Sequence, residues 1–510
     1  MKKKKNSKKI VFDIPKHLPI ITSILVVVLS ALLFFLAKGY TVDLQNKAVN
    51  RRGVITVNSR PVQVEIYIDN ELIGKGSKSK AVNTGSHSVA LKREKYHTWS
   101  KDVRALAETT TIITPWMLLK NPEKYTVWDS KKTYIAHWIS EDENIALILL
   151  QEDEGTYALW RYKLQSGLLD IFDNPSKIWV SDNKDIEILL SPNGNHALLT
   201  LSNSDEKVKY LINTSSQFST ESSKPLDLGG RSEFKLQWAK DNKHLLLISP
   251  ESILSYNINS QITYSMVSQS NNQQSIWRTD KNGNLYTLKD LSKPDDTVYT
   301  YSIEKQGLDG TGESYLISSI SLQKDEKYIE HYRENPSNYI PFTNSPFNTQ
   351  TVGKITDFDI NVDIAGVFIT TTSASYWYDN TSGTYIMINP YPSELLDFSK
   401  NNKHFLFNSN DSLYTFTFSK YSENPVEKTG STQFTNAKKG DYVGWIDNSN
   451  YYSYIKEEYL NIAEKDGDNE TKVLPTKNML FYNIEASKNS ITTLEVDTKG
   501  DLLINQYRIQ

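Results

Sequence analysis

Two hydrophobic patterns divide this sequence. Residues 18–37 run for 20 positions without a charged side chain. As a helix rising about 1.5 Å per residue, such a segment spans about 30 Å, the thickness of a bilayer core. From residue 53 onward, apolar residues come in short alternating runs rich in β-branched and aromatic side chains, which is typical of half-buried β-strands. We therefore predict an all-β body preceded by a single transmembrane helix over residues 18–37.

The flanking charges predict how that helix is oriented. Residues 1–17 form a basic tail with seven Lys and one Asp. Because the more positive flank stays inside, we expect a cytoplasmic N-terminus and a single-pass protein of the cell membrane, with the bulk of the chain extracytoplasmic. A cleaved signal peptide is the main alternative. The apolar stretch is long for one, and Phe35 and Ala37 make a poor cleavage site.

A small β-domain is predicted directly after the helix. Residues 38–52 are interpreted as a polar tether, and alternating strands occupy residues 53–120. In this region apolar residues alternate with polar ones across residues 64–69 and again across residues 87–91, so each run presents one face to a core.

The same region resembles a known family, the PEGA domain, a small β-sandwich of bacterial and archaeal surface proteins. The matching positions are residues 53–57, Ser59, Pro61, residues 64–69, Gly74, residues 85–91 and Tyr96. The resemblance implies a non-catalytic spacer or adhesion module beside the membrane.

Residues 125–510 carry an internal repeat. Three segments, 190–199, 238–247 and 398–407, align without a gap as an apolar residue, a polar turn and a second apolar run. Weaker copies begin near Ile139, Trp277, Leu322, Ile360, Trp445 and Ala486. The starts lie 38 to 51 residues apart. Such a period, with about four short strands per unit, favours a β-propeller over helical repeats.

The strongest copy, Ser191-Pro192-Asn193-Gly194-Asn195, resembles the turn of the TolB-type propeller repeat. Nine candidate starts overcount if one or two are accidental. At roughly 45 residues per blade, residues 125–510 are expected to form about eight blades.

Composition then removes several functions. The formal charge of −3 leaves a mildly acidic body once the basic tail is set aside, so no nucleic-acid partner is expected. Without Cys the chain has no disulfide, thiolate nucleophile or Cys-ligated metal. Zincin, α/β-hydrolase, P-loop and dinucleotide-binding motifs are also missing from the sequence.

We therefore predict no catalytic, cofactor-binding or metal-binding residues. His196, His244 and His404 occupy one position in three repeats and should lie far apart. The acidic turns at 280–284 and 466–469 could supply oxygen ligands for calcium, although Asp and Asn also cap ordinary hairpins. The segment Tyr376-Trp377-Tyr378 is either ordinary strand filling or part of a ligand platform.

The function that fits these expectations is a non-catalytic, membrane-anchored binding or scaffold protein of a prokaryotic cell envelope. Its partners would be the membrane, through residues 18–37, and an envelope protein or glycan. One alternative is an envelope glycan hydrolase that uses two carboxylates from different blades. Another is a cytosolic propeller that the helix merely targets. The oligomeric state is left open.

Overall fold

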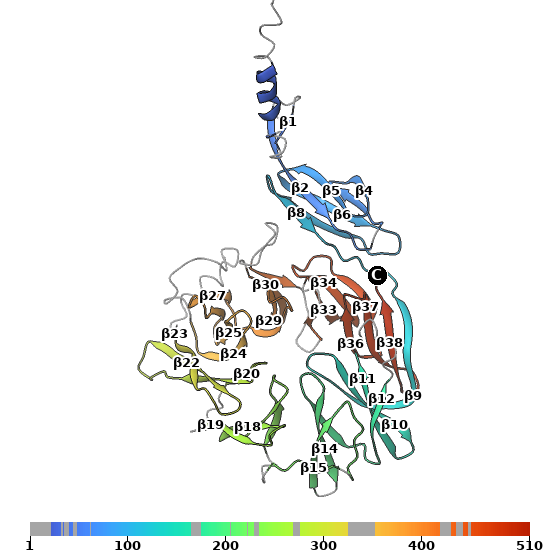
Figure 1. The fold of residues 1–510 in the computed structure, drawn as a ribbon, viewed down its shortest axis with the longest axis vertical. Helices are drawn as coiled ribbons and strands as arrows, with labels where there is room; N and C mark the ends of the chain where they lie inside the picture. The colour runs from blue at the N-terminus through green and yellow to red at the C-terminus, as the bar shows by residue number, and fades with distance from the viewer. Residues whose placement is uncertain are drawn as a thin grey trace, which may run out of the picture. The chain divides into compact units, whose positions relative to one another are not determined.

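The structure is a computed structural model that divides into two compact units, and along the described chain the change from the first to the second comes after Met117. It describes residues 22–31, 34, 40–43, 48–61, 63–164, 175–203, 206–221, 223–228, 234–268, 276–324, 352–418, 430–434, 442–446 and 450–510. Apart from the helix near the N-terminus, the regular elements of these residues are strands, as predicted (Figure 1).

The helical segment covers residues 22–31. Within the described residues, no helix has both the length and the hydropathy needed to cross a membrane. Most of the rest of the predicted span 18–37, and the whole of the predicted basic tail 1–17, lie outside those residues.

The stretch predicted to be a polar tether contains strands instead. β1 (Tyr40–Asp43) pairs antiparallel with the start of β2 (Ala48–Val57), from Tyr40 opposite Arg51 to Asp43 opposite Ala48. Tyr, Thr and Val favour strands, and the edge of β2 offers them backbone hydrogen bonds. The β-structure therefore begins before residue 53.

Two four-stranded sheets form the small unit, as expected of a β-sandwich. In the first sheet β2 pairs with β1, with β5 (Lys78–Asn83) and, in parallel, with β8 (Thr110–Ile113). The second has the order β4 (Glu71–Lys75), β3 (Glu65–Ile68), β6 (Gly85–Lys92), β7 (Trp99–Ala105). The predicted alternation is confirmed, because Val64, Ile66, Ile68, Val89 and Leu91 are all buried.

The larger unit is built from antiparallel sheets that follow one another along the chain. β9 (Glu123–Ile139), β10 (Ile145–Asp153), β11 (Thr156–Lys163), β12 (Ser176–Ser181), β36 (Met479–Glu485), β37 (Ser490–Val496) and β38 (Asp501–Arg508) form a seven-stranded sheet. β13 (Ile186–Leu190), β14 (His196–Asn203) and β15 (Glu206–Asn213) form a three-stranded sheet.

Five four-stranded sheets follow the three-stranded sheet in the chain and precede β36. The first is β16 (Lys235–Trp238), β17 (His244–Ile248), β18 (Ser252–Asn257) and β19 (Thr263–Ser268). The second is β20 (Trp277–Thr279), β21 (Asn284–Asp290), β22 (Val298–Gly307) and β23 (Ser314–Gln323). The third is β24 (Ile355–Asn361), β25 (Gly366–Thr371), β26 (Ser375–Asp379) and β27 (Thr384–Asn389). The fourth is β28 (Glu394–Phe398), β29 (His404–Ser409), β30 (Ser412–Thr417) and β31 (Gly430–Phe434). The last is β32 (Gly444–Trp445), β33 (Tyr451–Lys456), β34 (Tyr459–Glu464) and β35 (Thr471–Pro475).

The seven-stranded sheet is two blades joined by one strand. The first part of β9 pairs with β38, from Glu123 opposite Arg508 to Asp129 opposite Leu503, and its last part pairs with β10. β9 is therefore the fourth strand of the last blade and the first strand of the first blade. Counted in this way, the described part of the unit forms eight blades in a ring (Figure 1). The predicted number was about eight.

Eight of the nine predicted repeat starts lie in, or immediately after, the innermost strand of a blade. The ninth, Leu322, lies in β23, the fourth strand of its blade, and is an accidental match. Its sequence resembles a repeat start because outer strands also carry apolar residues next to polar turns.

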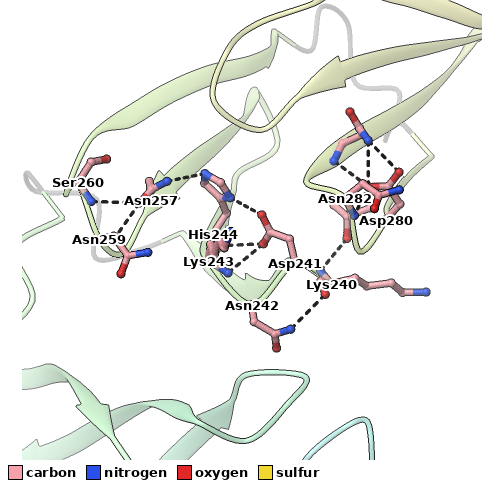
Figure 2. Close-up of polar contacts among 12 residues, drawn as sticks. Lys240, Asp241, Asn242, Lys243, His244, Asn257, Asn259, Ser260, Asp280 and Asn282 are labelled. Carbon is pink, nitrogen blue, oxygen red and sulfur yellow. Dashed lines mark hydrogen bonds and ion pairs between the residues drawn. The ribbon is translucent and has the colours of Figure 1, made fainter.

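The repeated turn after the innermost strand is held by one set of hydrogen bonds. In three blades a Ser hydroxyl donates to an Asp or Asn two residues later, with distances of 2.8–3.0 Å, and accepts the N–H five residues later. In the β16–β17 turn, Ala239 replaces the Ser, and Asp241 accepts the N–H groups of Lys243 and His244 (Figure 2). The recurring sequence pattern is therefore local turn chemistry.

These turns also join neighbouring blades. Every pair of neighbouring blades, including the last and the first, has at least one hydrogen bond or ion pair among residues in the innermost strand, just before it or in the turn after it. The pairs are Asp142–Pro192, Asn193–Asn242, Lys240–Thr279, Lys281–Asp363, Asn361–Asn402, Asp397–Trp445, Tyr442–Tyr482 and Glu143–Asn483. The polar contacts thus form a ring around the centre of the propeller.

Gly194 tests how tightly adjacent blades pack. Its φ is +69°, and a Cβ there would lie 2.5 Å from Cβ of Ile145 in the preceding blade. We expect Gly194→Ala to lower the free energy of unfolding by about 1–2 kcal/mol for the left-handed backbone and roughly 1–3 kcal/mol more for the clash. Denaturant titration measures both effects together.

Gly155→Ala is the matched control, because Gly155 has φ +77° and no atom within 4 Å of its added Cβ. It should show the backbone cost alone. Equal losses in the two variants would mean that the blades do not pack closely at Gly194.

Candidate functional site

One position in each blade lies next to the centre of the propeller. It is the residue two places before the start of the repeated turn, and the strand registers place it opposite equivalent residues of the second strand. The eight are Trp138, Leu189, Gln237, Arg278, Asp359, Asp397, Gly444 and Asn483. Six of them, the last six in chain order, line two cavities.

The first cavity, named here the ionic cavity, has a volume of about 460 Å³. Arg278 lies in its wall and pairs with two carboxylates of the next blade, Nε at 3.0 Å from Asp359 and Nη2 at 2.5 Å from Asp357. Its guanidinium also lies 5.9 Å from the ring centre of Phe358. Burial raises the pKa of Asp359, and the Arg278 charge opposes that rise. The positive charge of Arg278 in this cavity wall is therefore balanced by the carboxylates of the next blade.

The second cavity, named here the acid–aromatic cavity, has a volume of about 630 Å³. The first, sixth, seventh and eighth blades contribute to it. Its lining comprises residues 141–144, 396–398, 400, 442–446, 453 and 481–484. Four carboxylates, one Lys and several aromatic rings are among these residues. The wall therefore carries an excess of negative charge beside π surfaces.

Asp397 is placed in this wall by a β-bulge. The register of β28 against β29 shifts between Leu395 and Asp397, so Leu396 has no partner, and such bulges re-aim side chains. Oδ2 of Asp397 accepts the N–H of Trp445 at 3.0 Å. Burial raises the pKa of Asp397 to about 6, although that hydrogen bond favours the ionised form.

Asn483 and Trp445 bring unused hydrogen-bonding atoms to the same cavity. Nδ2 of Asn483 donates to Oε2 of Glu143 at 3.2 Å, whereas its Oδ1 has no hydrogen-bond partner among the described residues. Nε1 of Trp445 is likewise buried without an acceptor in this part of the chain. Buried polar atoms are normally paired, so these two indicate a place where a ligand could complete the bonding.

The three repeated histidines lie in three different blades, as predicted, and each has a structural role. Nδ1 of His244 lies 2.6 Å from Asp241, and Nε2 lies 2.9 Å from Nδ2 of Asn257 (Figure 2). Because an amide nitrogen can only donate, Nε2 accepts and the Nδ1 proton is donated to Asp241. The rings of His196 and His404 pack against tryptophans of the next blade, at 6.4 Å and 5.6 Å.

Among the described residues, no group of three or more His, Cys, Asp or Glu side chains is placed to hold a metal ion. The Asp280 carboxylate instead accepts the N–H groups of Asn282 and Asn284 and the hydroxyl of Tyr286. This is the hairpin-capping role that the sequence offered as the alternative to calcium. Asp468 N–H is similarly bonded to Asp466.

Tyr376 and Trp377 are strand residues buried between neighbouring blades. Both are at most 2% exposed, and Trp377 packs 5.0–6.1 Å from Phe398, Phe405 and Phe418. The strand-filling interpretation is confirmed for these two residues, and they cannot be part of an exposed ligand platform.

The residues that line the centre are not among those that the sequence pattern singled out. The aligned repeat copies begin at Leu190, Trp238 and Phe398, one residue after the lining position. A charged residue near the end of an apolar strand, as in Leu395-Leu396-Asp397-Phe398 or Trp277-Arg278-Thr279, is the signal that could have found them. The lining residues of different blades come together only when the blades close into a ring.

Among known protein families, a match is found for the small unit. Residues 52–115 match the PEGA domain family, which confirms the resemblance seen in the sequence. No curated protein sequence matches the chain.

Among solved structures, a eukaryotic initiation factor covers 83% of this chain and 98% of its own, with 12% identity and a TM-score of 0.39. The WD40 domain of SCAP from fission yeast covers 76% and 98%, with 10% identity and a TM-score of 0.38. An uncharacterized protein from Listeria monocytogenes EGD-e covers 70% and 100%, with 10% identity and a TM-score of 0.37. Similarities this low do not indicate what the present chain binds.

Asp397→Asn should change how stability depends on pH. In the wild-type protein the raised pKa of Asp397 stabilises the fold below about pH 4, and that contribution is lost as pH rises to about 6. We expect the variant to gain roughly 1–3 kcal/mol over the wild type between pH 4 and pH 7. Denaturant midpoints at several pH values measure this difference.

Asp241→Asn is the comparison, because burial is outweighed there by hydrogen bonds from His244 and Lys243, which hold the pKa of Asp241 below its usual value. Its stabilising contribution is present above about pH 4, so the variant should lose about 1–3 kcal/mol at pH 7. If the stability of Asp397→Asn relative to the wild type falls between pH 4 and pH 7, the environment assigned to Asp397 is wrong.

Proposed function

We propose that this chain is a non-catalytic binding or scaffold protein held at the outer face of a prokaryotic cell membrane. Residues 18–37 anchor it, the PEGA unit acts as a spacer, and the propeller binds an envelope protein or glycan at its centre. The observation that carries the proposal is the row of equivalent positions lining two cavities, with polar side chains from five blades.

The anchor rests on sequence. The uncharged segment 18–37, with seven Lys before it, has the length and flanking charge of a signal anchor with its N-terminus inside. In that orientation, everything after residue 37 faces the outside of the cell.

The binding role rests on the cavities. Volumes of about 460 and 630 Å³ lie in the range of ligand sites, and mixed polar and aromatic walls suit oriented recognition. The pairing of Arg278 with Asp357 and Asp359 fixes the charges of one wall before any partner arrives, which lowers the cost of ordering them on binding.

A glycan hydrolase is the second candidate, and one observation favours it. Asp397, with its raised pKa, shares a cavity with Glu141 and Glu143, and a protonated acid near a second carboxylate is the arrangement that glycoside hydrolysis uses. Measuring turnover together with binding separates the two candidates.

The membrane proposal predicts that charges in the apolar segment will release the protein. Val26→Arg combined with Val28→Arg should cost several kcal/mol of insertion free energy, because each Arg at a helix centre costs about 2.5–3.5 kcal/mol. Carbonate-washed membranes should retain the wild type and lose the variant. Thr22→Arg combined with Ser23→Arg, nearer the segment's end, should be retained much better.

Protease added to intact cells checks the orientation, because an outside body is cleaved without lysis. Cleavage only after lysis would place the body inside and contradict the proposal.

The binding proposal predicts saturable binding of the full-length protein to an envelope glycan or an envelope protein, with no product released. Immobilised wild-type protein is incubated with both classes, and reducing ends are measured in parallel. Arg278→Gln should weaken capture at least tenfold if the ionic cavity takes part, whereas Lys207→Gln, in an exposed ion pair on the second blade, should not. Turnover that disappears in Asp397→Asn would replace this proposal with the hydrolase.

A further inference from the structure

We propose that the acid–aromatic cavity binds an organic cation, namely a primary ammonium or guanidinium group on a molecule that also carries a carbonyl or hydroxyl oxygen. This inference deepens the proposed function and rests on its binding role. It names the chemistry of the group that enters the cavity, whether that group belongs to a protein side chain or to an amino sugar.

The charge balance of the wall is the first argument. Glu141, Asp142, Glu143 and Asp397 line the cavity with Lys400 as the one cation among the described lining residues. In the ionic cavity, by contrast, Arg278 and Lys240 stand beside Asp359 and Glu141. Glu141 lines both cavities, and without it the acid–aromatic cavity still has three acids to one Lys. A positive ligand would therefore correct an imbalance that the neighbouring cavity does not have.

The bonding of Asp397 points the same way. Within the described residues this carboxylate accepts backbone N–H groups, those of Trp445 and Phe398, and takes part in no ion pair. A carboxylate can accept bonds at two oxygens and about four lone-pair directions. A partly buried acid with this spare capacity gains most from a donor that is itself charged.

Asn483 supplies an independent observation. Its side chain belongs to a residue only 3% exposed, lines the same cavity, and leaves Oδ1 without a donor. An ammonium has three N–H donors and a guanidinium has five, so one cation can serve more than one acceptor in the wall. A neutral hydroxyl has one donor to give.

The aromatic residues and Trp445 define the rest of the ligand. Tyr442, Trp445, Phe481 and Tyr482 all line the cavity, and a cation is attracted to the faces of such rings. Nε1 of Trp445 is a buried donor without an acceptor among the described residues. An oxygen close to the cationic group of the ligand would accept it, which is why the proposal includes a carbonyl or hydroxyl.

Isothermal titration calorimetry of the full-length protein in detergent tests the inference with matched probes. Nα-acetyl-lysine amide is compared with Nα-acetyl-norleucine amide, Nα-acetyl-arginine amide with Nα-acetyl-citrulline amide, and glucosamine with N-acetylglucosamine. In each pair only the first member is positively charged. We expect saturable binding of the charged member of at least one pair, at least tenfold tighter than its neutral counterpart, and the pair that binds identifies the source. Equal binding within all three pairs, or no binding of any of the three cations, overturns the inference.

Two variants locate the site. Asp397→Asn should weaken binding of the charged probe at least tenfold, whereas Asp295→Asn, which removes an exposed carboxylate outside the described cavity lining, should leave it unchanged. Trp445→Phe keeps an aromatic ring and removes the donor. The Trp445→Phe variant should bind the charged probe that the wild type binds, which carries an oxygen, several-fold more weakly. Its binding of butylamine, which has no oxygen, should stay the same. Unchanged affinity in Asp397→Asn places the cation elsewhere.

The outcome is separable from that of the proposed function. If an envelope partner is captured but a saturating cation probe does not compete with it, the binding role stands and the assignment of this cavity falls. If the cation binds but no partner is captured, the cavity assignment stands and the scaffold role falls.

Discussion

The larger unit depends on β9 belonging to two blades at once. Its first part completes the sheet of β36–β38, and its last part starts the sheet of β10–β12. Without this strand the last blade would end in an open edge with unpaired backbone groups. The closure also brings residues more than 300 positions apart into hydrogen-bonding distance, as Asn483 and Glu143 show.

Closing the ring sets the environment of its central side chains. Arg278, Asp359 and Asp397 hold equivalent positions in three consecutive blades, and Arg278 reaches the carboxylates of the next blade. Asp397 follows one blade later, and its nearest bonded neighbour is a backbone N–H. Two equivalent acids thus differ in charge compensation because of the identity of the preceding blade's residue, and not because of their own strands.

The structure also separates residues that stabilise the ring from those with spare bonding capacity. Turn residues such as Ser191, Asp241 and Asp280 use their oxygens within their own hairpins. His196 and His404 pack on the next blade. In the described part of the chain, Asn483 and Trp445 each keep a buried polar atom without a partner, and Asp397 is bonded by backbone N–H groups and no ion pair. All three lie in one cavity wall. This contrast is the physical basis for placing recognition there.

Local patterns along the chain were enough to predict the all-β class, the PEGA resemblance and a repeat of about eight units. These properties depend on local signals: two-residue alternation, turn residues such as Asn193 and Gly194, and their spacing. The sequence also indicated correctly that the repeated histidines lie in separate blades. The strands at Tyr40–Asp43 and from Ala48 were missed, because their pairing requires a partner edge. Which side chains meet at the centre depends on contacts between distant parts of the chain. Asp397, Trp445 and Asn483 come from three blades, and no spacing along the chain encodes a contact that forms only when a ring closes.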